Sequence, residues 1–182
     1  MPDVEPEITI KQIEPGDKLT GLSLGNPAFT PLKTFLQRHA HKYETQSLAR
    51  TYAAFTADPK KVVAYITLVC GEIVTGDSDQ DLLLDPELDF NYRHYPAVKI
   101  ARLAVGQKYQ KGGLGRALVN LALGQAKWII CPTVGCRFVV VDSKQESLIF
   151  YERCGFTMLD TDENRRRAAP VMWIDLNRVD LD

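Results

Sequence analysis

The sequence lacks most of the features that mark membrane, secreted or metal-binding proteins. No apolar run approaches the roughly 20 residues that a bilayer-spanning helix needs. The first residues, MPDVEPEITI, are acidic and have neither the cationic nor the apolar region of a secretory signal. The four cysteines, Cys70, Cys131, Cys136 and Cys154, form no CxxC pair and no zinc-type cluster with histidine. We therefore expect a cytoplasmic location, reduced thiols, no bound metal and no membrane partner.

An excess of charge of either sign is also absent. Lys and Arg total 22 and Asp and Glu total 23, which gives a net charge of -1. This balance argues against attraction of the whole molecule to nucleic acid or to an anionic membrane, although a local basic patch is compatible with it. The 182 residues predict a single domain over residues 1–182, large enough to bury a core without disulfides or metals.

The alternation of apolar and polar residues predicts a mixed α/β fold with one sheet. The pattern places three helices along the chain: one that begins at residue 30, one over residues 112–128 and a short one over residues 146–154. Turn residues separate the strands, and the two strands around residues 57–60 are expected to form a hairpin. The expected strands cover residues 8–13, 48–56, 62–74, 98–105, 138–141, 156–159 and 171–176.

The first helix has a clear start and one apolar face. Thr30 is expected to be its N-cap, with Pro31 at the first helical position. Phe35 and Tyr43 follow at helical spacing, and His39 shares their face, where we expect a hydrogen-bonded, partly buried ring rather than a base.

An acidic stretch interrupts the chain before the strand at 98–105. Residues 76–89 contain six carboxylates, namely Asp77, Asp79, Asp81, Asp85, Glu87 and Asp89. Two interpretations stay open: a solvated surface loop, or an acidic lip that attracts a cationic substrate.

The most informative segment runs from Ile100 to Gly115, IARLAVGQKYQKGGLG. A strand leads into a glycine-rich loop and then into a helix, whose N-terminus offers unpaired N–H groups and a positive dipole end. Glycines let a large anion approach the backbone, so the segment predicts a pyrophosphate site. Arg116 and Ala117 after the last glycine exclude a GxxxxGK[ST] loop, and the spacing does not match a GxGxxG dinucleotide site.

A second segment makes the assignment more specific. Residues 147–156 read SLIFYERCGF and put Tyr151 on a short helix that ends before Gly155. Together with the loop pattern QxxGxG, this segment resembles the GCN5-related N-acetyltransferase (GNAT) superfamily. The resemblance implies a single N-acetyltransferase domain, with a mixed, mostly antiparallel sheet flanked by helices and an acetyl-CoA-binding core at about residues 98–159.

The resemblance also implies roles for individual residues. Acetyl-CoA is the donor, and Tyr151 is expected to give a proton to the departing thiolate. Backbone groups of Leu103, Ala104 and Val105 are expected to pair with the pantetheine arm. Backbone amides of the loop are expected to bind the pyrophosphate, and these belong to Gln110, Lys111, Gly112, Gly113, Leu114, Gly115 and Arg116.

The expected reaction is direct attack of a primary amine on the thioester, with a backbone amide near Val105 stabilising the oxyanion. The base stays open among Glu72, His94 and water. Arg102 shares a strand face with apolar residues, so it calls for a carboxylate partner in an ion pair or for a contact with substrate.

A narrower resemblance concerns the acceptor. The segments ARTY (49–52), AYITL (64–68) and RLAV (102–105) resemble the acetyltransferase toxins of bacterial toxin–antitoxin pairs, which acetylate aminoacyl-tRNA. This resemblance implies tRNA and an antitoxin as partners. Binding tRNA requires a basic footprint. The residues that could form it by clustering are Lys108, Lys111, Arg116, Arg165, Arg166 and Arg167.

The alternatives remain open at this point. The acceptor is an unidentified primary amine: a small molecule, a peptide N-terminus, a lysine or an aminoacyl-tRNA. A non-catalytic CoA-binding or protein-interaction module on the same fold is the alternative of another class. A homodimer is kept only as a general expectation for soluble proteins.

Overall fold

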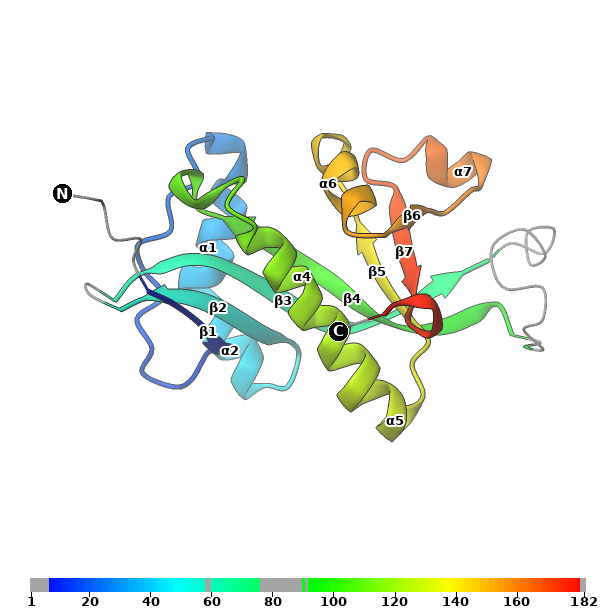
Figure 1. Cartoon of the computed structure of the whole chain (residues 1–182), viewed down its shortest axis with the longest axis horizontal. Helices are drawn as coiled ribbons and strands as arrows, with labels where there is room; N and C mark the ends of the chain where they lie inside the picture. The colour runs from blue at the N-terminus through cyan, green and yellow to red at the C-terminus, as the bar shows by residue number, and fades with distance from the viewer. Residues whose placement is uncertain (1–6, 58–59, 76–89, 91, 181–182) are drawn as a thin grey trace. The chain divides into compact units, whose positions relative to one another are not determined.

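The computed structural model describes residues 7–57, 60–75, 90 and 92–180. The acidic stretch 76–89 lies outside the described residues, so both interpretations of it stay predictions. Seven strands form one sheet in the order β1-β2-β3-β4-β5-β7-β6 (Figure 1). Their bounds are β1 Ile8–Gln12, β2 Arg50–Thr56, β3 Val62–Val74, β4 His94–Val105, β5 Phe138–Asp142, β6 Thr157–Met158 and β7 Val171–Asp175.

The sheet is mixed and mostly antiparallel, as predicted. β4 and β5 are parallel, whereas β1 with β2, β2 with β3, β5 with β7 and β6 with β7 are antiparallel. Several strand ends differ from the prediction by one or two residues. The largest difference is at β4, which begins at His94, four residues before the expected start, because Tyr95 and Ala97 are buried there and continue the strand alternation.

The helices follow the predicted order with shifted ends. The long helix begins at Leu114 rather than residue 112, and it continues through a π-helical segment, Gln125–Ile130, to Val134. The helix bounds are α1 Thr30–Arg38, α2 Ala40–Thr45, α4 Leu114–Gly124, α5 Cys131–Val134, α6 Leu148–Arg153 and α7 Asp162–Arg165.

The extended helix bears on the membrane prediction. Within the described part of the chain, Leu114–Val134 is one helix of 21 residues that is long and apolar enough to cross a membrane by length and composition. A core helix of a soluble protein passes the same test, so this is weak evidence. The sequence pattern ends this helix at Trp128 and therefore misses its full apolar length.

The chain forms two compact units. The first comprises Met1–Val69 and Ala101–Val119, and the second comprises Cys70–Ile100 and Asn120–Asp182. The long strands β3 and β4 contribute residues to both. The prediction of one acetyltransferase domain over residues 1–182 stays a prediction.

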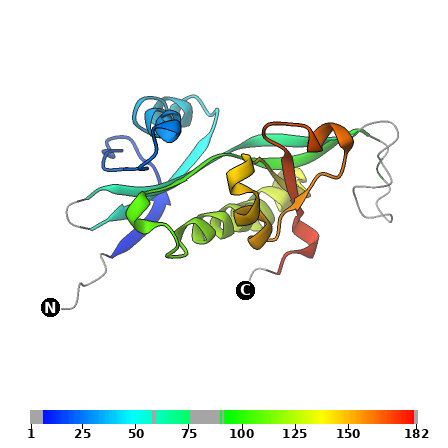
Figure 2. The same ribbon diagram turned by 90° about the horizontal axis from the view of Figure 1, so that it is seen from above.

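The first unit has a core between strands and the N-terminal helices. Figure 2 shows α1 and α2 on one face of the strands of this unit. The buried residues that join these elements are Ile13, Leu19, Leu22, Phe35, Leu36, Ala40, Ala53, Phe55, Val62, Tyr65 and Ala104. The apolar face predicted for the first helix is thus the face that packs on the sheet.

The start and the end of α1 differ from the prediction. Thr30 is the first helical residue rather than the N-cap. Capping occurs one turn earlier, where the Asn26 side chain accepts a hydrogen bond from the Ala28 N–H at 2.9 Å. The helix breaks at His39, and the His39 side chain is exposed instead of partly buried.

The second unit has its own hydrophobic core, and an ion pair and the hydrogen bonds of one buried asparagine connect its segments. Ile73, Tyr95 and Phe138 belong to its buried cluster. Arg137, just before β5, forms an ion pair with Asp175 at the end of β7, with Nη2 and Oδ2 at 2.9 Å. Asn164 donates to the carbonyls of Leu159 and Val171 at 2.9 and 3.0 Å, which closes the polar loop before β7.

Candidate functional site

The glycine-rich loop lies in the first unit, directly after β4. Lys111 and Gly113 have φ values of +67° and +82°, which turn the backbone toward the start of α4. Gly112 and Gly113 are exposed, and a Cβ added to Gly113 would meet nothing within 4 Å. The Ala117 N–H donates to the Gly113 carbonyl at 3.0 Å, so the amides before Ala117 precede the helical ladder. The loop can therefore present N–H groups to an anion.

The backbone expected to bind the pantetheine arm lies just before this loop. The parallel pairing of β4 with β5 covers Ala97–Ile100 and stops there. Residues 103–105 lie beyond the paired stretch, where β4 has no ladder partner from β5 in the described sheet. The Val105 carbonyl accepts a hydrogen bond from Gln110 Nε2 at 3.2 Å. A ligand that pairs with this carbonyl would replace the Gln110 side chain.

Tyr151 lies in the second unit, on α6, and is only 6% exposed. Its ring makes edge contacts with Phe150 and Phe156, with centroids at 5.0 and 5.5 Å. Burial, and secondarily the nearby Cys154, raise the pKa of the Tyr151 hydroxyl well above its ordinary value. The hydroxyl therefore keeps its proton at neutral pH and can only donate it or share it in a hydrogen bond. The short helix ends as predicted, with Gly155 at φ +94°.

The two side chains predicted as base candidates lie together in the second unit. His94 Nδ1 and Glu72 Oε2 are 3.0 Å apart, on β4 and β3, and both side chains are more than half exposed, at 61% and 53%. His94 is the first residue of β4, whereas Val105 is the last. Among the described residues, no hydrogen bond or ring contact joins the pair to Tyr151. Their role as base stays a prediction.

Arg102 makes a contact that the sequence did not predict. Of the two expected partners, a carboxylate is not found within the described part of the chain. The guanidinium instead lies over the Phe35 ring of α1, 3.8 Å from its centroid. This contact arises because α1 covers this side of β4 with an aromatic ring. The carboxylates of residues 76–89 lie outside the described residues, so the ion pair and the substrate contact both stay predictions.

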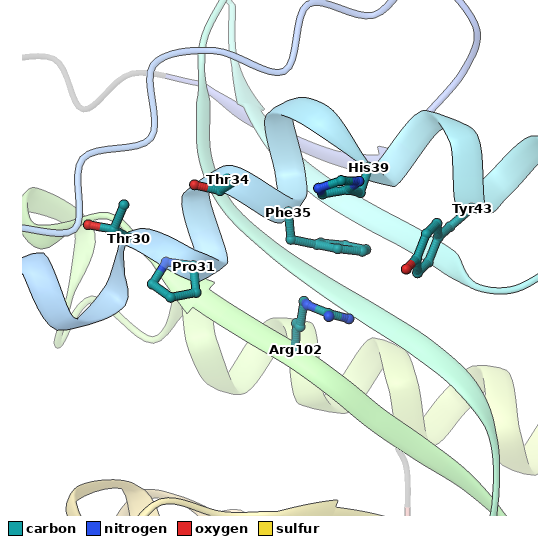
Figure 3. A pocket seen from close by; sticks show the side chains of 7 residues that line it. All are labelled: Thr30, Pro31, Thr34, Phe35, His39, Tyr43 and Arg102. Carbon is teal, nitrogen blue, oxygen red and sulfur yellow. The ribbon is translucent and has the colours of Figure 1, made fainter.

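A pocket opens beside Arg102, entirely within the first unit (Figure 3). It has a volume of about 540 Å³, in the range of small-ligand sites. The sequence pattern singled out all of its lining residues except Thr34 but did not predict that they form a pocket, since spacing along the chain does not show that α1 faces residue 102. The lining residues are Thr30, Pro31, Thr34, Phe35, His39, Tyr43 and Arg102.

The basic residues predicted to form a tRNA footprint are divided between the two units. Lys108, Lys111 and Arg116 belong to the first unit, in and around the glycine-rich loop, and all three are exposed. Arg165 belongs to the second unit, where it pairs with Asp160 and, at 3.2 Å, with Asp162. Its charge is therefore partly neutralised. Arg166 and Arg167 follow it and are exposed.

The described residues contain no group of three or more His, Cys, Asp or Glu side chains that could hold a metal ion. The four cysteines are free thiols, of which Cys136 is buried and Cys70 exposed. The groups identified above are the loop amides and Arg102 in the first unit and the buried Tyr151 hydroxyl in the second.

The chain is similar to a protein family and to a curated protein. The family described as Acetyltransferase (GNAT) domain matches residues 51–158. A curated relative, the tRNA-acetylating toxin of Mycobacterium tuberculosis (strain ATCC 25618 / H37Rv), is 26% identical over 156 residues, which are 84% of this chain and 86% of that protein.

Solved structures of similar proteins cover almost the whole chain. A tyrosine-to-phenylalanine mutant of KacT has a TM-score of 0.77 at 25% identity, covering 93% of this chain and 95% of its own. AtaT complexed with acetyl-methionyl-tRNAfMet has a TM-score of 0.75 at 21% identity, with 94% and 96% covered. AtaTR bound with AcCoA has a TM-score of 0.73 at 20% identity, with 93% and 94% covered.

Proposed function

Since the chain belongs to the GNAT acetyltransferase family and is an acyltransferase with acetyl-CoA as its donor, we propose that its acceptor is the amino group of an aminoacyl-tRNA. The observation that carries this proposal is the similarity to the tRNA-acetylating toxin over 84% of the chain. A primary amine on another molecule is the broader class to which this acceptor belongs. The reaction moves the acetyl group from sulfur to nitrogen.

The donor is proposed to bind along the end of β4 and across the glycine-rich loop. Backbone groups of residues 103–105 pair with the pantetheine arm, and the amides of residues 110–116 hold the pyrophosphate. Support comes from the open space at Gly113 and from the end of the β4–β5 pairing at Ile100. Gln110 releases the Val105 carbonyl when the arm enters.

The proposed chemistry is one displacement through a tetrahedral intermediate. The amine nitrogen forms a bond to the thioester carbonyl carbon, the C–S bond breaks, and the nitrogen loses a proton. An N–H group near Val105 stabilises the oxyanion. Tyr151 gives its proton to the sulfur as the C–S bond breaks and regains one from solvent, so that the products are the amide and the CoA thiol.

The pKa of Tyr151 shapes its proposed role. A free thiol has a pKa near 8.5, below that of the buried Tyr151 hydroxyl, so complete transfer to a free thiolate would be uphill. The hydroxyl is therefore expected to donate a hydrogen bond to the sulfur and to release its proton only as the C–S bond breaks. We propose water as the acceptor of the amine proton, with the Glu72–His94 pair as the alternative.

The partners and location are proposed from the same relatives. AtaT is known in complex with the C-terminus of the antitoxin AtaR and with an acetylated tRNA. We infer from this an antitoxin partner and, because charged tRNA is found inside the cell, a bacterial cytoplasmic location. A homodimer remains an expectation.

The test is acetyl transfer with radiolabelled acetyl-CoA to charged tRNAs, to deacylated tRNA, and to a panel of small amines and peptides. We expect label on at least one charged tRNA and none on deacylated tRNA. Label on small amines or peptides alone would show that the acceptor is not an aminoacyl-tRNA. Binding of acetyl-CoA without any acetyl transfer would favour the non-catalytic module.

A further inference from the structure

The side chains beneath α1 form a fixed stack that ends in a cation. The Tyr65 hydroxyl donates to the Leu32 carbonyl at 2.7 Å, which ties α1 to β3. The Phe35 ring stacks on Tyr65, with centroids 6.4 Å apart and planes 24° apart. The Arg102 guanidinium also contacts the Phe35 ring, at 3.8 Å. The stack holds the guanidinium plane in place before any ligand arrives.

The charge of Arg102 is not used within the described structure. No ion pair with a described carboxylate neutralises it, and its flat face is occupied by Phe35. Its N–H edge is therefore the part left for a ligand. Such an edge matches the two oxygens of a carboxylate or a phosphate.

Aromatic rings from α1 and α2 line the pocket on one side of this cation (Figure 3). His39 is exposed, and its ring lies 6.3 Å from that of Tyr43. Tyr43 in turn makes an edge contact with Phe35 at 5.4 Å. Tyr43 is half-buried, so the exposed His39 ring is the most accessible of the set. Accessible rings beside an arginine are typical of sites that stack unpaired bases and bind the adjoining phosphates.

The helices that carry these rings are basic, although the whole chain is not. Between residues 30 and 45 there are three cations, Lys33, Arg38 and Lys42, and one acidic residue, Glu44. The Glu44 carboxylate accepts the Thr51 N–H at 2.6 Å and is thus directed toward β2. Arg38 and Lys42 lie on either side of the break at His39, are exposed and do not line the pocket. Their charge adds only to the positive potential around α1 and α2.

The pocket is also close to the donor. Arg102 is one residue from Leu103 and three from Val105 on the same strand, which corresponds to about 10 Å at most. We propose that this pocket binds the single-stranded 3′ end of the acceptor RNA, with a phosphate on Arg102 and an unpaired base against His39 and Tyr43. This inference rests on the proposed acceptor, an aminoacyl-tRNA.

The test compares intact tRNA with the same tRNA lacking its 3′-terminal CCA. Arg102→Met should weaken binding of intact tRNA by about tenfold and lower the slope of log affinity against log salt by about 0.7, the value for one single-strand phosphate. It should leave binding of the trimmed tRNA unchanged. His39→Ala should weaken intact tRNA about fivefold or more, and His39→Phe should restore it, because a ring is the required feature.

Lys33→Gln is the matched control, since it removes a cation from α1 outside the pocket lining. His39 is exposed, so its variants test the site even where Arg102→Met folds poorly. The inference is overturned, and the proposed acceptor kept, when charged tRNA is acetylated but these variants bind both tRNAs like the wild type. It is also overturned when Arg102→Met affects only small carboxylate-bearing amines. Absence of tRNA binding and acetylation by the wild type would remove the proposed acceptor itself.

Discussion

The glycine-rich loop after β4 and the pocket beside Arg102 belong to the same unit but are built in opposite ways. The loop offers backbone amides around Gly113, with a left-handed φ and open space. The pocket offers side chains of α1 and α2 that converge on one residue of β4. A backbone site depends on where glycine is allowed, whereas a side-chain site depends on which elements pack together. The first can be recognised along the chain, and the second only in the folded structure.

The largest expected effect is on the loop. Gly113→Glu should abolish acetyl-CoA binding, because the new carboxylate fills the space at φ +82° and repels the pyrophosphate. Calorimetric titration with acetyl-CoA measures this. Gly16→Glu is the control, since Gly16 also has a left-handed φ and open space around it. Gln110→Ala should keep affinity within about threefold, because the loop is proposed to bind through amides. Normal binding by a folded Gly113→Glu protein would contradict the loop assignment.

The next effect concerns the chemical step. Tyr151→Phe should keep acetyl-CoA affinity and slow acetyl transfer by about 10²-fold or more, as expected for loss of a general acid. Thiol release under single-turnover conditions gives the rate. Tyr92→Phe makes the same change on a side chain that is 70% exposed and should have no effect. An unchanged rate in Tyr151→Phe would leave the tyrosine as a packing residue only.

A smaller effect should separate the pocket from the loop. Phe35→Leu removes the ring beneath Arg102, so the acceptor KM should rise about fivefold, the range of a cation–π contact. The Kd for acetyl-CoA should stay within about twofold. Phe55→Leu is the matched substitution, because Phe55 is a buried ring of the same unit, next to Lys60 at 5.0 Å. Equal changes in both variants would mean that KM responds to general loosening of the core.

The smallest expected effect is on stability, and it concerns the loop after β1, which contacts α2 beside the pocket. The Asp17 carbonyl and His41 Nε2 are in hydrogen-bond contact at 2.9 Å, and this links the loop after β1 to α2. Burial alone would raise the pKa of the Asp17 carboxyl, but hydrogen bonds from Lys11, the Glu14 N–H and Lys60 outweigh it and lower the pKa to about 2.

This folded pKa lies below the ordinary value of 3.8, so the ionised carboxylate stabilises the fold above that value. The contribution is lost as the pH falls toward about 2. Asp17→Asn should lower the free energy of unfolding by about 1–2 kcal/mol at pH 7 and by about half as much at pH 3. Urea melts at the two pH values measure this. Asp162→Asn, on an exposed ion pair, should cost less than about 0.5 kcal/mol. If the loss in unfolding free energy of Asp17→Asn is the same at both pH values, the stabilisation does not come from the charge of the Asp17 carboxylate.

Prediction from the sequence succeeded where local chemistry decides. The turn residues at 57–60 and the apolar strand after them predicted β3 with both its ends, and the turn chemistry of Gly155 predicted the end of α6. It failed where tertiary contacts decide. The helix start shifted because Asn26 caps an earlier turn, which makes Thr30 a helical residue. The partner of Arg102 was missed because Phe35 is distant along the chain and meets it only after α1 packs on the sheet.

The most direct test of the account is a calorimetric titration of the wild-type protein with acetyl-CoA, followed by addition of charged tRNA with thiol release monitored. The account predicts saturable donor binding, and then release of about one thiol for each amino group acetylated. Absence of donor binding by the folded protein would contradict the central claim that the loop after β4 is the donor site.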